Sequence, residues 1–95
     1  MTVYAIVNTN LKNPEPYEEY KAKVGPAVAQ FGGRYLVRGG DHSIIEGSWH
    51  PTRIVMLEFS TREDFDKFYH SPEYQAVIGI RHANADTDMV VVEGV

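Results

Sequence analysis

The sequence contains no cysteine in its 95 residues. This absence excludes disulfide bonds, thiolate nucleophiles, and zinc or iron–sulfur sites held by cysteine. The four histidines form no i,i+4 pair and show no HxH or HExxH spacing, so they do not make a ligand set either. We therefore expect no metal and no cofactor. The histidines are His42, His50, His70 and His82.

Long hydrophobic runs and a basic surplus are also missing. No apolar run approaches the ~18 residues of a membrane-spanning helix. The first ten residues, MTVYAIVNTN, lack the basic region of a secretory signal. Nine lysines and arginines face 13 acidic residues, a formal net charge of −4, whereas proteins that wrap phosphate backbones carry the opposite balance. These features predict a cytoplasmic protein that binds neither membranes nor nucleic acid.

The composition is that of an ordinary globular protein, with 43% hydrophobic and 12% aromatic residues. A chain of this length is too short for two stable cores, which predicts a single domain over residues 1–95. Alternating apolar residues and β-branched runs indicate four strands. The predicted strands are Val3–Thr9, Arg34–Arg38, Arg53–Phe59 and Met89–Glu93.

Apolar residues at helical spacing predict the helices between these strands. The first begins at Asn13-Pro14 and runs through Phe31, where the pair Gly32-Gly33 ends it. Pro26 is expected to kink or split this helix, because proline lacks an N–H and crowds the preceding turn. Two further helices are predicted to begin at the capping residues Ser60 or Thr61 and at Ser71.

The order of these elements is βαββαβ, which predicts an α+β, ferredoxin-like fold with helices on one face of an antiparallel sheet. The strands are nevertheless apolar on both sides, because Ile54 and Met56 alternate with Val55 and Leu57. An antiparallel sheet with one face in water should alternate apolar and polar residues instead. A second copy could cover the bare face. We therefore predict a homodimer formed through the helix-free sheet face.

The segment FGGRYLVRGG places two arginines in a strand that otherwise resembles core. Alternation puts Arg34, Leu36 and Arg38 on one face, opposite the face expected to pack on the helices. A regular antiparallel register sets Arg34 opposite Glu58. The same register sets Arg38 opposite Ile54, so both arginines would lie on the dimer face; a bulge near the glycines would change it.

Five segments, YEEY, FGGRYLVRGG, IEGSWHPTRIVMLEF, FYHSPEYQ and IRHANADTDMVVVEG, resemble in spacing and order the domain-of-unknown-function family thirteen-thirty (DUF1330). The resemblance covers nearly the whole chain and implies a dimeric α+β barrel whose paired sheets enclose a pocket. It implies no particular activity. Phe68 departs from the family, in which a tryptophan often precedes the tyrosine. The characteristic positions are Tyr20, Gly33, Arg34, Arg38, Gly39, Glu46, Gly47, Arg53, Glu58, Tyr69, Ser71, Tyr74 and Arg81.

The resulting hypothesis is a homodimer that binds or transforms a small anionic or polar organic molecule in an interior pocket. The arginines would orient this ligand, Glu58 would hold one arginine or act as a base, and tyrosines would donate hydrogen bonds. The alternative is a non-catalytic dimeric module whose Arg–Glu pairs only specify the interface. The candidate catalytic residues are Arg38, Glu58 and Tyr69, and the candidate ligand-binding residues are Tyr20, Arg34, Arg38, Arg53, Ser71 and Arg81.

Overall fold

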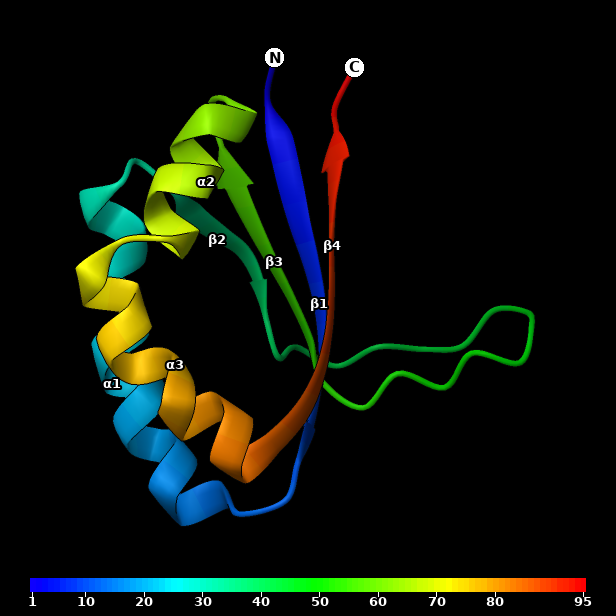
Figure 1. The fold of residues 1–95 in the computed structure, drawn as a ribbon. Helices are drawn as coiled ribbons and strands as arrows, with labels where there is room; N and C mark the ends of the chain where they lie inside the picture. The colour runs from blue at the N-terminus through cyan, green and yellow to red at the C-terminus, as the bar shows by residue number, and fades with distance from the viewer.

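The structure, a computed structural model, describes residues 1–95 as a four-stranded antiparallel sheet with three helices on one face (Figure 1). The strand order across the sheet is β2-β3-β1-β4. This confirms the predicted α+β, ferredoxin-like arrangement. The elements are β1 (Val3–Leu11), α1 (Pro14–Gln30), β2 (Arg34–Arg38), β3 (Ile54–Phe59), α2 (Arg62–Tyr69), α3 (Pro72–Asn84) and β4 (Ala85–Glu93).

The core lies between the sheet and the helices, because alternate residues of the central strands are buried. In β3, Val55, Leu57 and Phe59 are buried, whereas the residues between them are half-buried. In β1 the same alternation buries the odd-numbered residues from Val3 to Thr9. These side chains meet the buried stripes of α1 and α3. Burial of this apolar surface is the main favourable contribution to folding.

Helix α1 is continuous through Pro26 over 17 residues, so of the two predicted outcomes, a kink or a split, the split does not occur. Buried residues lie on both sides of the proline, with Val24 before it and Val28 after it. Their packing offsets the backbone hydrogen bond that proline removes. The helix ends at Gln30, and Gly32 follows its C-cap residue as predicted, with a φ of 79° that is a left-handed conformation favouring glycine.

Side-chain caps begin the two later helices. The Thr61 hydroxyl accepts a hydrogen bond from the Asp64 backbone N–H at 3.0 Å, so Thr61 rather than Ser60 caps α2. The Ser71 hydroxyl accepts from the Tyr74 N–H at 3.1 Å and caps α3 as predicted. Each cap satisfies an N–H group that has no partner within its helix. The two caps fix where α2 and α3 begin.

A bulge interrupts the pairing of β2 with β3. Arg34 lies opposite Glu58, as predicted, but Val37 lies opposite Met56 and Arg38 opposite Val55. Leu36 is therefore the extra residue, and the predicted pairing of Arg38 is wrong. One extra residue reverses the alternation beyond it. Arg38 consequently shares the face of the buried Val55, toward the helices, rather than the helix-free face.

An extended arm, residues 39–53, leaves the sheet between β2 and β3 and projects on the side opposite the helices (Figure 1). At its base, the Asn8 Oδ1 atom accepts a hydrogen bond from the Thr52 N–H at 2.9 Å. Ile45 and Trp49, farther along the arm, are 88% and 60% exposed. The arm thus carries apolar side chains that nothing in the protomer covers.

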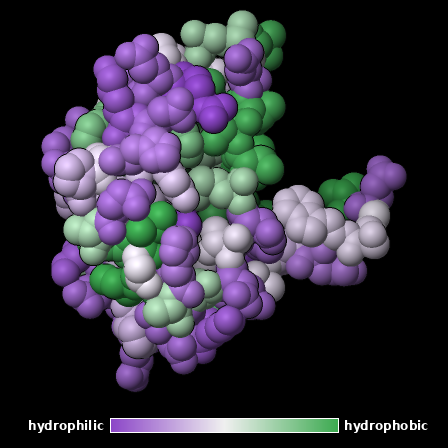
Figure 2. Space-filling view, in the orientation of Figure 1, coloured by the Kyte–Doolittle hydropathy of each residue, from purple (hydrophilic) through white to green (hydrophobic).

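The helix-free face of the sheet also exposes apolar residues. Val90 and Val92 of β4 are 59% and 47% exposed, and Leu36 is 42% exposed. Figure 2 shows hydrophobic surface along the side on which the sheet lies, opposite the helices. None of the three helices has the length and hydrophobicity needed to cross a membrane.

Candidate functional site

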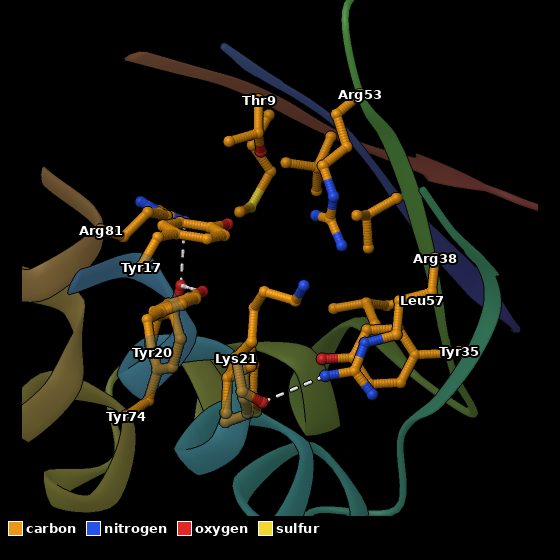
Figure 3. Close-up of a pocket in the computed structure, with 15 residues that line it drawn as sticks. Thr9, Tyr17, Tyr20, Lys21, Tyr35, Arg38, Arg53, Leu57, Tyr74 and Arg81 are labelled. Carbon is orange, nitrogen blue, oxygen red and sulfur yellow. Dashed lines mark hydrogen bonds between the residues drawn. The ribbon is translucent and has the colours of Figure 1, made fainter. Parts of the chain in front are cut away.

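A cavity of about 40 Å³ lies between the sheet and helices α1 and α3 (Figure 3). Fifteen residues line it, and ten of them are hydrophobic. Its charged lining residues are all basic, and no aspartate or glutamate reaches it. The lining comprises Val7, Thr9, Tyr35, Arg38, Arg53, Val55, Leu57 and Met89 from the sheet and its flanks, and Tyr17, Tyr20, Lys21, Val24, Phe68, Tyr74 and Arg81 from the helices.

Arg38 reaches the cavity because the bulge turns it toward α1. Its Nη2 atom donates to the Lys21 carbonyl at 3.1 Å, and its guanidinium lies 4.3 Å from the centre of the Tyr35 ring. A cation over an aromatic face is stabilised electrostatically. These contacts hold an exposed arginine at one end of the cavity, which we call the mouth, without using a carboxylate.

Arg53, the residue before β3, also points into the mouth (Figure 3). Its side chain passes close to Gly39, where an added Cβ would lie 2.8 Å from the Arg53 Nε atom. Gly39 also has a φ of 72°, which side chains rarely adopt. The glycine that ends β2 is therefore required for the position of Arg53.

Arg81, Tyr74 and Tyr20 form the opposite, buried end of the cavity, which we call the inner end. Arg81 is only 6% exposed, and its Nη1 atom donates to the Tyr74 hydroxyl at 2.9 Å. The Tyr74 and Tyr20 hydroxyls are hydrogen-bonded at 2.9 Å. The Arg81 Nη2 atom contacts the His82 ring nitrogen at 3.3 Å, while Nε is buried without a partner. No carboxylate balances this buried charge.

Burial also sets the protonation of the inner end. Burial is the main cause that raises the pKa of Tyr20 and of Tyr74 above the ordinary tyrosine value. For Arg81, burial lowers the pKa, but the neighbouring hydroxyls of Tyr74, Tyr20 and Tyr69 outweigh it, and the net shift is upward. At neutral pH the inner end therefore combines a guanidinium cation with two protonated hydroxyls.

Four of the predicted ligand-binding residues meet in this cavity: Tyr20, Arg38, Arg53 and Arg81. The other predicted residues lie elsewhere. Arg34 and Glu58 form an ion pair at 2.7 Å on the helix-free face, where the Arg34 side chain is 69% exposed. The convergence of Arg34 and Arg38 on one ligand, which the sequence left open, is therefore not observed, because the two side chains lie on opposite faces.

The two remaining candidates, Ser71 and Tyr69, lie in the helical layer outside the cavity lining. Ser71 is buried at the cap of α3, where its hydroxyl also donates to the Phe68 carbonyl at 2.7 Å. Tyr69 stacks on Phe65 with ring centroids 5.9 Å apart and is half-buried. Both residues have structural contacts that account for their positions.

Sequence reasoning missed several lining residues, chiefly tyrosines. Tyr17 stacks on Tyr20 at 5.1 Å between ring centroids, and Tyr35 supports Arg38. Tyr74 is buried on the apolar side of α3, and its hydroxyl joins Tyr20 to Arg81. The signal that could have identified the role of Tyr74 was Arg81, a charged residue on the same apolar stripe of α3. A buried arginine needs polar partners, and Tyr74 is the polar side chain two turns earlier on that stripe.

No group of three or more histidine, cysteine, aspartate or glutamate side chains is placed to hold a metal ion. The cavity instead offers cationic and hydroxyl donors with apolar walls. Such a lining can bind an anionic or carbonyl oxygen and exclude water from an apolar body beside it.

The model of the family "Domain of unknown function (DUF1330)" matches residues 2–95. The chain belongs to the DUF1330 family. This confirms the resemblance carried by the five sequence segments. No curated protein matches this DUF1330 chain.

Solved structures share the fold of this DUF1330 protein at low sequence identity. A protein of unknown function from Rhodopseudomonas palustris is similar with a TM-score of 0.83 and 17% identity, over 99% of this chain and 82% of the other. A dimeric ferredoxin-like protein of unknown function from Jannaschia sp. CCS1 has a TM-score of 0.74 and 15% identity, over 99% and 100% of the two chains.

A third similar structure is SnoaB, a cofactor-independent oxygenase from Streptomyces nogalater. Its TM-score is 0.71 at 10% identity, over 99% of this chain and 93% of SnoaB. At these identities the likeness shows the fold of this DUF1330 chain and leaves its activity to be inferred from the site itself.

Proposed function

We propose that this protein binds a small organic anion with an apolar body in the cavity between the sheet and the helices. One observation carries the proposal. Of the nine lysines and arginines, six form ion pairs with carboxylates, which leaves three without one (9 − 6 = 3). These three are Arg38, Arg53 and Arg81, and all three line the one cavity.

The electrostatics favour a ligand over a purely structural role. A buried cation with no carboxylate partner, such as Arg81, costs free energy, and an anion that enters the cavity recovers part of it. The paired surface residues, such as Lys23 with Glu19 at 2.7 Å, have no such need. Specificity of an interface can explain Arg34 and Glu58, but it does not explain three unpaired arginines around one cavity.

The walls of the cavity favour a ligand with an apolar body. Val24, Val55, Leu57 and Met89 contribute aliphatic surface, and Tyr35 contributes an aromatic face. Ligand pockets typically combine such walls with a few polar groups that fix orientation. The volume of about 40 Å³ admits only a few atoms. A larger ligand is accommodated if the exposed Arg38 side chain swings outward.

We further propose that the protein is a homodimer formed through the helix-free sheet face. The exposed Val90 and Val92 need cover, and so do Ile45 and Trp49 on the arm, which projects on the same side. A space of about 300 Å³ on this face is lined in part by Ile6, Trp49 and Val90. The similar protein from Jannaschia sp. CCS1, described as dimeric, supports a second copy as the occupant.

Calorimetric titration with benzoate and phenylacetate, each compared with its neutral amide, tests the binding proposal. We expect the acids to bind about tenfold or more tightly than the amides, because hydrogen bonds to charged groups are stronger. Arg38→Gln should weaken binding of the acids by about tenfold or more. Arg34→Gln is the matched control, since it removes an arginine from the other face of the same strand.

Two outcomes would contradict the proposal. Equal binding of acids and amides would show that charge does not select the ligand. Equal losses in Arg38→Gln and Arg34→Gln would show that the cavity is not the binding place.

A further inference from the structure

The inner end of the cavity has more hydrogen-bond donors than acceptors. The Tyr74 oxygen accepts from Arg81 Nη1 at 2.9 Å and shares one hydrogen bond of 2.9 Å with the Tyr20 hydroxyl. Two hydroxyl hydrogens are present, and that bond uses one of them. Whichever tyrosine donates, the hydrogen of the other is left over.

A second donor at the same end is also unused. The Arg81 Nε–H group is buried and has no hydrogen-bond partner. Arg81 itself is more than nine-tenths buried and lines the cavity. The lining contains no carboxylate, amide or imidazole side chain, and none of its hydroxyl oxygens is hydrogen-bonded to the Arg81 Nε atom. A buried donor without an acceptor costs free energy that an entering oxygen removes.

We infer that the inner end binds an oxygen that carries no proton, such as a carboxylate, phenolate, enolate or ketone oxygen. This inference rests on the proposed function and narrows its ligand class. The ligand would be an organic acid with two oxygen functions, one at the mouth beside Arg38 and Arg53 and one at the inner end. Its apolar body would lie between them, against the aliphatic walls.

The protonation of the tyrosines agrees with this assignment. Because burial raises the pKa of Tyr20 and Tyr74, both hydroxyls keep their protons at neutral pH and remain hydrogen-bond donors. An alcohol could accept from the surplus hydroxyl, but it would bring a further donor to an end of the cavity that already has unused donors. An ammonium group would in addition meet the like charge of Arg81.

Paired ligands provide the test. 4-Hydroxy-3-nitrophenylacetate has a carboxylate at one end and an acidic phenol at the other, whereas 3-nitrophenylacetate lacks the phenol oxygen. We expect the two-ended acid to bind the wild-type protein about tenfold or more tightly than the one-ended acid. In the double variant Tyr20→Phe/Tyr74→Phe this ratio should fall toward one. In Arg34→Gln, which changes the other face, it should stay at the wild-type value.

A second measurement needs no variant and so does not depend on the variant's folding. The nitrophenolate form absorbs visible light, and we expect binding at pH 6 to increase its absorbance, because a cation and donors lower the pKa of the bound phenol. A bound probe that stays protonated, or equal affinities for the two acids, would overturn the inference and leave the proposed function intact. Failure of both acids to bind would overturn the proposed function as well.

Discussion

The two faces of the sheet use arginine in different ways. On the helix-free face, Arg34 has a carboxylate 2.7 Å away and is largely exposed. On the helix-covered face, Arg38 contacts a tyrosine ring and a backbone carbonyl and has no carboxylate. The two residues are four positions apart in one strand. The comparison shows that an arginine is best classified by its partner rather than by its place in a sequence motif. Arg34 is paired with a carboxylate on the surface, whereas Arg38 has no carboxylate and is a candidate to bind a ligand.

The apolar residues differ between the faces in the same way. Those under the helices, such as Val55 and Phe59, are covered within the protomer. Those on the other face, such as Val90 and Val92, are not. We therefore expect substitutions on the helix-free face to alter dimer assembly and substitutions in the cavity to alter ligand binding. Each kind of substitution should leave the other property nearly unchanged. Four predictions test this separation, beginning with the largest effect.

Val90→Asp should have the largest effect, on assembly. The substitution would bury a carboxylate without a partner in the proposed interface. A two-fold symmetric interface would contain two such carboxylates, one from each protomer. We expect the dissociation constant of the dimer to rise by about a thousandfold or more. Sedimentation velocity over a dilution series measures this change. Ala76→Asp, on the exposed surface of α3, is the control, and similar dimers from both variants would refute the proposed interface.

Arg81→Met should abolish ligand binding but not the fold. The substitution removes a buried charge that has no carboxylate and keeps a similar side-chain volume, so we expect the free energy of unfolding to stay equal or rise by about 1 kcal/mol. Binding of the organic acid should fall by about a hundredfold. Urea denaturation and calorimetry measure the two effects. A large loss of stability would instead assign Arg81 a structural role.

Alkaline pH should destabilise the protein through the buried tyrosines. Their pKa values are raised in the folded state, so the stability they support is full below about pH 10, where unfolded tyrosine ionises, and falls above it. We expect a loss of roughly 1 kcal/mol per buried tyrosine between pH 10 and pH 11. Urea denaturation at each pH measures the slope. An equal slope in Tyr20→Phe/Tyr74→Phe would contradict this cause.

Arg34→Gln should have the smallest effect. The Arg34–Glu58 pair is exposed in the protomer, and such pairs contribute little to stability. We expect unchanged ligand affinity and a change in the dimer dissociation constant of less than about tenfold. Calorimetry and sedimentation on one preparation test both points. A loss of ligand binding would show that the two faces are not independent.

The fold was largely predictable because its signals are local and repeated. Alternation in β3 and the caps at Thr61 and Ser71 placed most of the elements. Strand β4 begins at Ala85, earlier than predicted, because its first half is polar. Asp86 and Asp88 there lie opposite Asn10 and Asn8 of β1 on the face without helices, where both aspartates are exposed in the protomer.

The site was only partly predictable. Tyr20, Arg53 and Arg81 could be named as candidates, and Arg34 was paired correctly with Glu58. Arg38 could be named but not assigned to a face, because five strand residues do not reveal a bulge. The contact of the Tyr74 hydroxyl with Tyr20 depends on the packing of α3 against α1. The residue pattern within one helix does not reveal which helix packs against it.

The bulge at Leu36 places Arg34 and Arg38 of one short strand on opposite faces of the sheet, so the residues of the two faces can be engineered separately. Positions 34 and 37 lie on the helix-free face, where we propose a second subunit, and positions 35 and 38 lie on the face that lines the cavity beneath the helices. A library that varies only the first pair would retune how protomers associate, while one that varies only the second would retune which molecules enter. A strand of strictly regular pairing would place 34 and 38 on the same side and tie these properties together.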